Sequence, residues 1–73
     1  MTDQTYDPQA DAAYFRLAKG DVVESAEVSP GVVLDYDADG RILGIEIVGA
    51  SKILAPGDWS KARLPGSQPH AAE

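Results

Sequence analysis

A chain of 73 residues with a formal net charge of −6 and no cysteine forms one domain at most. A domain this small buries only about 60% of the surface that its unfolded chain exposes, so its hydrophobic core is marginal. The lack of cysteine excludes disulfides and thiolate–metal sites, which leaves a carboxylate-bound cation or oligomerisation as the means of further stabilisation.

Charge is unevenly distributed along the chain. Residues 1–40 carry nine acids and two bases, whereas residues 41–73 carry three acids and four bases. An acidic folded half repels phosphate backbones, so we expect no nucleic-acid partner. The same charge favours a basic protein partner or a cation, and plain solubility is the alternative reason for it.

The N-terminal residues and the hydropathy of the chain predict its location. Residues 1–4 lack the basic start and the apolar run of a secretory signal. No apolar stretch approaches the roughly 20 residues that are needed to cross a bilayer. We therefore expect a cytoplasmic protein that does not enter a membrane.

The first half of the chain predicts three strands. A short strand ends just before Asp7, and Asp7 followed by Pro8 signals a turn or a single helical turn that Asp7 caps. Residues 13–17 alternate apolar and polar side chains, which predicts a second strand. Residues 22–28 predict a third strand, after a turn at residues 19–21.

The strongest local signal is a β-hairpin in residues 32–48. Two β-rich runs flank the turn at residues 37–40, where Asp39 and Gly40 tolerate the positive φ of a tight turn. If these two residues form a two-residue loop, all pairs on one face are apolar: Tyr36 with Leu43, Leu34 with Ile45, and Val32 with Ile47. A three-residue loop with a bulge at Gly40 would shift this register and stays open as the alternative.

The C-terminal third predicts one short helical turn and a tail. Residues 50–54 form the helical turn, which the following Pro-Gly sequence ends. Residues 55–73 are rich in proline and small polar residues and predict a flexible tail that Trp59 and Leu64 tether weakly to the sheet. The predicted fold class is therefore mainly β: a compact domain of residues 1–54, with a small antiparallel sheet of four to five strands and one short C-terminal helical turn.

Several segments of the chain together resemble one known family. In chain order they are Tyr6-Asp7-Pro8, Ala10-Asp11, Tyr14-Phe15-Arg16-Leu17, Val33-Leu34-Asp35-Tyr36-Asp37, Gly40-Arg41-Ile42, Gly44-Ile45-Glu46-Ile47 and Ala50-Ser51. Over residues 4–54 the chain is similar to the short prokaryotic proteins of domain of unknown function 2283, which have larger aliphatics at Ala13 and Phe15. The resemblance implies a compact β-sheet protein with no established activity or catalytic residues, and an accessory or antitoxin-like partner of another small protein.

A cation-binding motif is also present in the hairpin. Asp35, Asp37, Asp39, Gly40 and Glu46 match the calcium-loop template D-x-D-x-D-G-x5-E. The flanking residues favour strands, however, whereas an EF-hand requires a helix on each side. In a hairpin Glu46 lies roughly 20 Å beyond the turn, at about 3.3 Å per residue, and does not return to it. The motif therefore leaves only a weak calcium site on the Asp35–Asp39 turn.

Other polar residues indicate structure more than chemistry. Arg16 and Glu46 point away from the predicted apolar face, which favours a cross-strand ion pair between them. The one histidine, His70, lies in the predicted tail, so no serine has a base beside it. We therefore expect no enzyme, no catalytic residues and no cofactor.

The leading functional hypothesis is a non-catalytic protein-interaction module. One predicted face of the sheet is apolar and the other is mixed, and a single short helix covers only part of one face. A homodimer or a small partner protein would cover the remaining apolar surface. The alternative is a cation-binding module that uses the Asp35–Asp39 turn.

Overall fold

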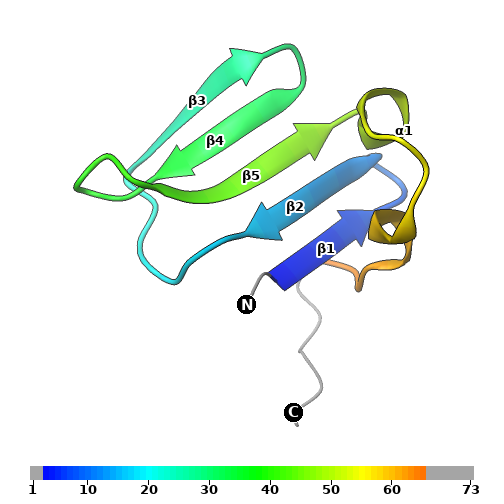
Figure 1. Ribbon diagram of the computed structural model, residues 1–73, viewed down its shortest axis with the longest axis horizontal. Helices are drawn as coiled ribbons and strands as arrows, with labels where there is room; N and C mark the ends of the chain where they lie inside the picture. The colour runs from blue at the N-terminus through cyan, green and yellow to red at the C-terminus, as the bar shows by residue number, and fades with distance from the viewer. Residues whose placement is uncertain (1–2, 66–73) are drawn as a thin grey trace, which may run out of the picture.

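The computed structural model of the protein describes residues 3–65, which form a five-stranded antiparallel sheet with two short helices (Figure 1). The strands lie in the order β1-β2-β5-β4-β3. The elements are β1 (Asp3–Asp7), β2 (Ala12–Arg16), β3 (Glu24–Ser29), β4 (Val32–Tyr36), β5 (Ile42–Val48), the α-helix α1 (Ala50–Ile53) and the 3₁₀-helix η1 (Asp58–Lys61). The predicted mainly β fold is confirmed.

The last strand of residues 3–65, β5, lies at the centre of the sheet. It pairs with β4 through a hairpin and with β2, which belongs to the N-terminal hairpin. β1 and β3 are the two outer strands. The sheet therefore depends on contacts between residues far apart in the sequence, which a local pattern of alternation does not predict.

Strand alternation gives the sheet an apolar and a polar face. Register places one row of apolar side chains across the strands at Tyr6, Ala13, Ile47 and Val32, and a second row at Phe15, Ile45, Leu34 and Ala26. We call this side the apolar face. The polar face carries the residues between them, which include Thr5, Tyr14, Arg16, Glu46, Asp35 and Ser25.

The predicted hairpin register is right over most of its length and wrong next to the turn. Val32 pairs with Ile47 and Leu34 with Ile45, as expected, but Tyr36 pairs with Ile42 instead of Leu43. The backbone N–H of Asp37 donates to the carbonyl of Arg41 at 2.9 Å, so the loop holds three residues, 38–40. The longer loop moves the pairing by one residue, and a bulge at Leu43 restores it.

The bulge at Leu43 also anchors the connection between β2 and β3. The Leu43 carbonyl accepts hydrogen bonds from the backbone N–H groups of Leu17, at 2.8 Å, and Ala18, at 3.2 Å. The Leu43 side chain is only 3% exposed, and a Cβ on Gly20 would lie 3.0 Å from it. Leu43 thus packs against the connection between β2 and β3 at this end of the sheet.

The hydrophobic core is small and lies at one end of the apolar face. Its buried side chains are Ala13, Ile47 and Ala50, and half-buried Leu54 and Trp59 pack on them. Ala50 begins α1, so the core sits where β5 passes into that helix, next to the turn between β1 and β2 (Figure 1). No side chain larger than leucine is fully buried among the described residues.

The segment after α1 differs from the prediction of a domain that ends at residue 54. Trp59, in η1, packs edge-on against Tyr6 with ring centroids 5.1 Å apart, and its indole N–H donates to the Ala55 carbonyl at 2.7 Å. Arg63 then forms a parallel bridge with Thr5 along the outer edge of β1. The compact part therefore continues to residue 65, and the predicted flexibility of residues 66–73, with His70, concerns residues outside those described.

Neither helix of residues 3–65 is long and apolar enough to cross a membrane.

Candidate functional site

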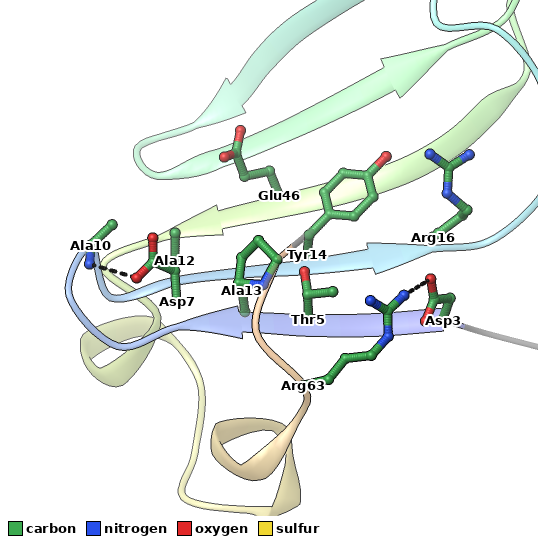
Figure 2. A pocket seen from close by; sticks show the side chains of 11 residues that line it. Asp3, Thr5, Asp7, Ala10, Ala12, Ala13, Tyr14, Arg16, Glu46 and Arg63 are labelled. Carbon is green, nitrogen blue, oxygen red and sulfur yellow. Dashed lines mark hydrogen bonds and ion pairs between the residues drawn. The ribbon is translucent and has the colours of Figure 1, made fainter. Parts of the chain in front are cut away.

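The polar face carries an open depression of about 680 Å³ over β1, β2 and β5 (Figure 2). Its charged side chains include Asp7 and Glu46 toward one end, and Arg16, Arg63 and Asp3 toward the other. The remaining lining residues are Thr5, Ala10, Ala12, Ala13, Tyr14 and Pro65. Both arginines lie at one end, where Asp3 accompanies them, and neither sign of charge dominates the depression.

One of the two arginines is held by the fold. The Arg63 guanidinium forms an ion pair with Asp3, and its backbone carbonyl accepts a hydrogen bond from Tyr6 N–H at 2.9 Å. The ion-paired hydrogen bond from Arg63 lowers the pKa of the Asp3 carboxyl. Arg63 therefore fastens the C-terminal segment to β1, which makes it a structural residue of the depression.

Arg16 and Glu46 do not form the predicted ion pair. In register, Arg16 lies opposite Gly44, while Glu46 lies opposite Tyr14. The tyrosine ring stands between the two charged side chains (Figure 2). The described residues contain ion pairs at Arg41 and Arg63, and none joins Arg16 to Glu46.

Tyr14 instead reaches across β5 to β4. Its hydroxyl donates to Asp35 Oδ2 at 2.9 Å, and Ser25 on β3 donates to Asp35 Oδ1 at 2.6 Å. Burial and the hydrogen bond to Asp35 raise the pKa of the Tyr14 phenol, which keeps it protonated. The three side chains form a polar belt across four strands that stabilises the sheet.

Gly44 makes this crossing possible. A Cβ at Gly44 would overlap the Tyr14 hydroxyl and would lie 3.2 Å from the Phe15 carbonyl oxygen. Gly44 has no side chain, and its backbone is buried because the ring of Tyr14 covers it. A glycine inside a strand commonly marks such a close approach, so this position is explained by packing.

The turn at residues 37–40 is built from its own carboxylates. Gly40 has a φ of 78°, and Asp37 Oδ1 accepts backbone hydrogen bonds from Asp39 and Arg41, both at 2.9 Å. The backbone hydrogen bond from Arg41 is the main cause of a lowered pKa at Asp37. The Arg41 guanidinium also pairs with Asp37 and with Asp39. Gly40 therefore adopts, within this turn, a left-handed conformation that glycine allows without strain.

The three carboxylates of the calcium motif are used separately. Asp35 lies on the polar face and accepts from Tyr14 and Ser25, whereas Asp37 caps the turn and Asp39 pairs with Arg41. Glu46 lies on β5 beside Tyr14, away from the turn. Within residues 3–65 no group of three or more acids or histidines is arranged to hold a metal ion. The geometry gives the calcium hypothesis no support.

A second polar centre, which the sequence analysis missed, lies at Asp11. Its carboxylate accepts from the Tyr6 hydroxyl at 2.7 Å, from the Ser51 hydroxyl at 2.6 Å and from the Ser51 N–H. Its carbonyl accepts from the N–H groups of Gly49, at 2.9 Å, and Ala50, at 2.8 Å. Asp11 thus joins the β1–β2 turn to the start of α1, and we call these contacts the Asp11 node.

The Asp11 node explains several residues of the pattern described above. Tyr6, Asp11 and Ser51 lie far apart in the sequence, yet they meet in one hydrogen-bonded group. Asp11 has a φ of 51°, in the left-handed region that aspartate tolerates better than most residues. The hydrogen bond from Ser51 is the main cause of a lowered pKa at Asp11. These residues are structural.

The arrangement of hydroxyl groups gives no sign of a nucleophile. Ser25 and Ser51 donate their hydroxyls to the carboxylates of Asp35 and Asp11, and Ser60 donates to the Gly57 carbonyl. Residues 3–65 contain no histidine that could act as a base. These three hydroxyl groups are engaged in hydrogen bonds within the fold.

The apolar face is only partly covered. η1 packs against β1, and among the described elements no helix makes comparable contact with β3 or β4. In Figure 1 both helices lie beside the strand ends, and no segment crosses the middle of the sheet. The apolar side chains away from α1 are only half-buried; we call them the open half of the apolar face, and they are Phe15, Ala26, Leu34, Tyr36 and Ile45.

Fold and register define the class of protein as a small single-sheet β domain with a thin core. A family model matches the chain over residues 4–51, and its description is "Protein of unknown function (DUF2283)". The match covers more than half of the chain, so the protein belongs to this family. Neither the search of curated proteins nor the search of solved structures finds a match.

Proposed function

We propose that this protein is a non-catalytic, cytoplasmic protein-interaction module that docks another protein onto the open half of its apolar face. The observation that carries the proposal is a row of large apolar side chains, at Phe15, Ile45 and Leu34, that are only half-buried on strands against which no described helix packs extensively. A sheet with an apolar face normally buries that face against another layer.

The energy available from such docking is appreciable for a small domain. Full burial of a leucine, isoleucine or phenylalanine side chain contributes roughly 1.5–3 kcal/mol relative to full exposure. Leu34, Phe15 and Ile45 are half-buried, so each retains part of that amount for a partner. Leu17, 45% exposed, extends the apolar surface past the end of β2.

Other surfaces of the sheet fit a docking role less well. The free edge strand, β3, carries Glu24 and Glu27 and a bulge between Glu27 and Ser29, features that discourage pairing with another strand. The opposite edge, at β1, is covered by Arg63. The polar face carries Arg16 and Glu46, which would have to be desolvated. The open half of the apolar face is therefore the favoured surface.

The resemblance to the family of unknown function implies an accessory or antitoxin-like role, and with it another small protein as the partner. Either a second copy or another small protein would use the same apolar surface, because both supply the missing layer. The charged residues around that surface then form a polar rim that stays exposed to solvent.

Site-specific photo-crosslinking in cells that naturally express the protein tests this function. A photoreactive phenylalanine analogue replaces Leu34 on the open half or, as a matched control, its neighbour Val33 on the polar face. We expect a discrete crosslinked protein from position 34 and little from position 33. Crosslinks from position 33 alone, or none from position 34, would contradict the proposal.

A further inference from the structure

We infer that the protein docked on the open half of the apolar face is a second copy of this chain, related by a two-fold axis and packed sheet against sheet. This inference rests on the proposed function and names its partner. In such a dimer each copy presents the same surface, and the two sheets lie about 10 Å apart with strands aligned to within roughly 30°.

The distribution of charge is compatible with a second copy. Two copies that each carry a net charge of −6 repel each other, and this repulsion is smallest when the surfaces that meet are uncharged. The open half of the apolar face meets this condition, since all five of its residues are neutral. The nearest acid in register, Glu24, lies beside Tyr36 on the edge strand, at the rim. Two open halves therefore meet without opposing like charges at their centre.

The residues that follow those described are poorly suited to cover this surface. Residues 66–73, Gly-Ser-Gln-Pro-His-Ala-Ala-Glu, contain no aliphatic side chain larger than alanine and no phenylalanine, tyrosine or tryptophan. Among the large apolar residues that follow β5, Leu54 and Trp59 pack at the other end of the face, whereas Ile53 and Leu64 are exposed. None of these residues covers Leu34, which leaves its exposed part to another molecule.

The register of the sheet makes the surface suitable for self-packing. Phe15, Ile45 and Leu34 lie in one row across β2, β5 and β4, so the central side chain belongs to the central strand. A two-fold axis close to Ile45 brings each Ile45 beside its equivalent and sets Phe15 and Leu34 on either side. Residues near the axis of an isologous interface meet their own copies in this way.

The interface is small, and this sets the expected affinity. A standard stable interface buries about 800 Å² on each partner, and smaller ones are weak or transient. A row of three large side chains with Ala26 and Tyr36 beside it falls in the smaller class. We therefore expect a reversible dimer that forms at tens of micromolar.

Sedimentation equilibrium of the full chain tests the inference over concentrations from about 5 to 200 µM, which bracket a dissociation constant of tens of micromolar. We expect the average mass to rise from 7.7 kDa toward twice that value. Leu34→Lys should weaken association at least tenfold, whereas Val33→Lys, on the polar face, should leave it unchanged. A monomer at every concentration, or a dimer that only Val33→Lys disrupts, would overturn the inference.

A second measurement keeps the test decisive if Leu34→Lys does not fold. A wild-type sample that mixes labelled and unlabelled chains reports nuclear Overhauser contacts between copies. Contacts among Phe15, Leu34 and Ile45 support the inference, and contacts confined to the polar face overturn it. If the wild-type chain is monomeric while position 34 crosslinks a different protein in cells, the proposed function stands and the second copy is excluded.

Discussion

At the end of the apolar face next to α1, Ala13 and Ile47 meet Ala50, and the Asp11 node ties the helix to the β1–β2 turn. At the other end of the same face, Leu34 and Tyr36 are only half-buried, and no described helix packs extensively against β4. The strands are continuous through both ends, so strand formation does not explain the difference. The difference arises because large side chains after β5, such as Leu54 and Trp59, pack only at the end next to α1.

This contrast shows how a chain without disulfides distributes its stability. The closed end combines apolar burial with a carboxylate that accepts several hydrogen bonds, including two from Ser51. The open end retains apolar surface whose burial is available to a partner. Substitutions at the closed end should therefore unfold the monomer, whereas substitutions at the open end should change association.

The largest expected effect is at the Asp11 node. Asp11→Ala removes the acceptor for Tyr6 and Ser51 and places alanine at a φ of 51°, which it tolerates poorly. We expect it to lower the urea midpoint more than either glycine substitution described below. Asp11→Asn keeps the left-handed backbone and one acceptor oxygen, so it should cost less. Equal effects of the two variants would show that the hydrogen bonds contribute little.

Acid should act on the same contacts. The hydrogen bonds to Asp11 and the contacts of Asp37 lower the pKa of these carboxyls in the folded state. Their contribution is therefore complete above the pKa of the unfolded chain, near 3.8, and is lost as pH falls through the lower folded values. Urea midpoints measured between about pH 6 and pH 2 should decline toward acid, and less steeply in Asp11→Asn.

The next effect tests whether Tyr14 requires a glycine beneath it. In Gly44→Ala the new Cβ displaces the Tyr14 hydroxyl from Asp35, which should destabilise the domain by about 2 kcal/mol through lost hydrogen bonding and overpacking. In a Tyr14→Ala background the same substitution should cost clearly less. Additive effects in this double-mutant cycle of urea midpoints would contradict the assignment.

A smaller effect is expected at the turn that closes the β4–β5 hairpin. Gly40 has a φ of 78° with no neighbouring atom within 4 Å of an added Cβ, so Gly40→Ala strains the backbone without a clash. We expect a loss of about 1 kcal/mol in thermal or urea unfolding. Gly40→Asn should lose less, because asparagine adopts this conformation more readily.

The smallest expected effect is that of calcium. Asp35, Asp37 and Asp39 are engaged by Tyr14, by the turn backbone and by Arg41, respectively. Millimolar calcium should therefore leave the melting temperature and the amide resonances of the turn unchanged. A saturable shift centred on these three residues would restore the cation-binding hypothesis.

The sequence predicts the parts of this molecule that depend on neighbouring residues. Alternation and an Asp-Gly turn predict the β4–β5 hairpin, and the pairs Leu34–Ile45 and Val32–Ile47 are confirmed. The predicted partner of Tyr36 is wrong because a backbone hydrogen bond between Asp37 and Arg41 sets the length of the turn. One residue in the loop changes the register, and a bulge further along compensates for it.

Features that depend on distant residues are harder to predict. The Arg16–Glu46 pair does not form because the register of β2 against β5 places Tyr14 opposite Glu46. The Asp11 node joins residues 40 positions apart, so no local motif reveals its geometry. Its residues do belong to the family pattern, which is the one sequence signal that could have marked Asp11 as important.

The central claim is that the chain itself covers one end of the apolar face and another molecule covers the other end. Methyl relaxation by a soluble paramagnetic probe measures this directly in dilute and concentrated samples. Ile47 should be protected in both samples, and Leu34 should be accessible when dilute and protected when concentrated, while Val33 stays unchanged. Protection of Leu34 at every concentration, or a change confined to Val33, would contradict the account.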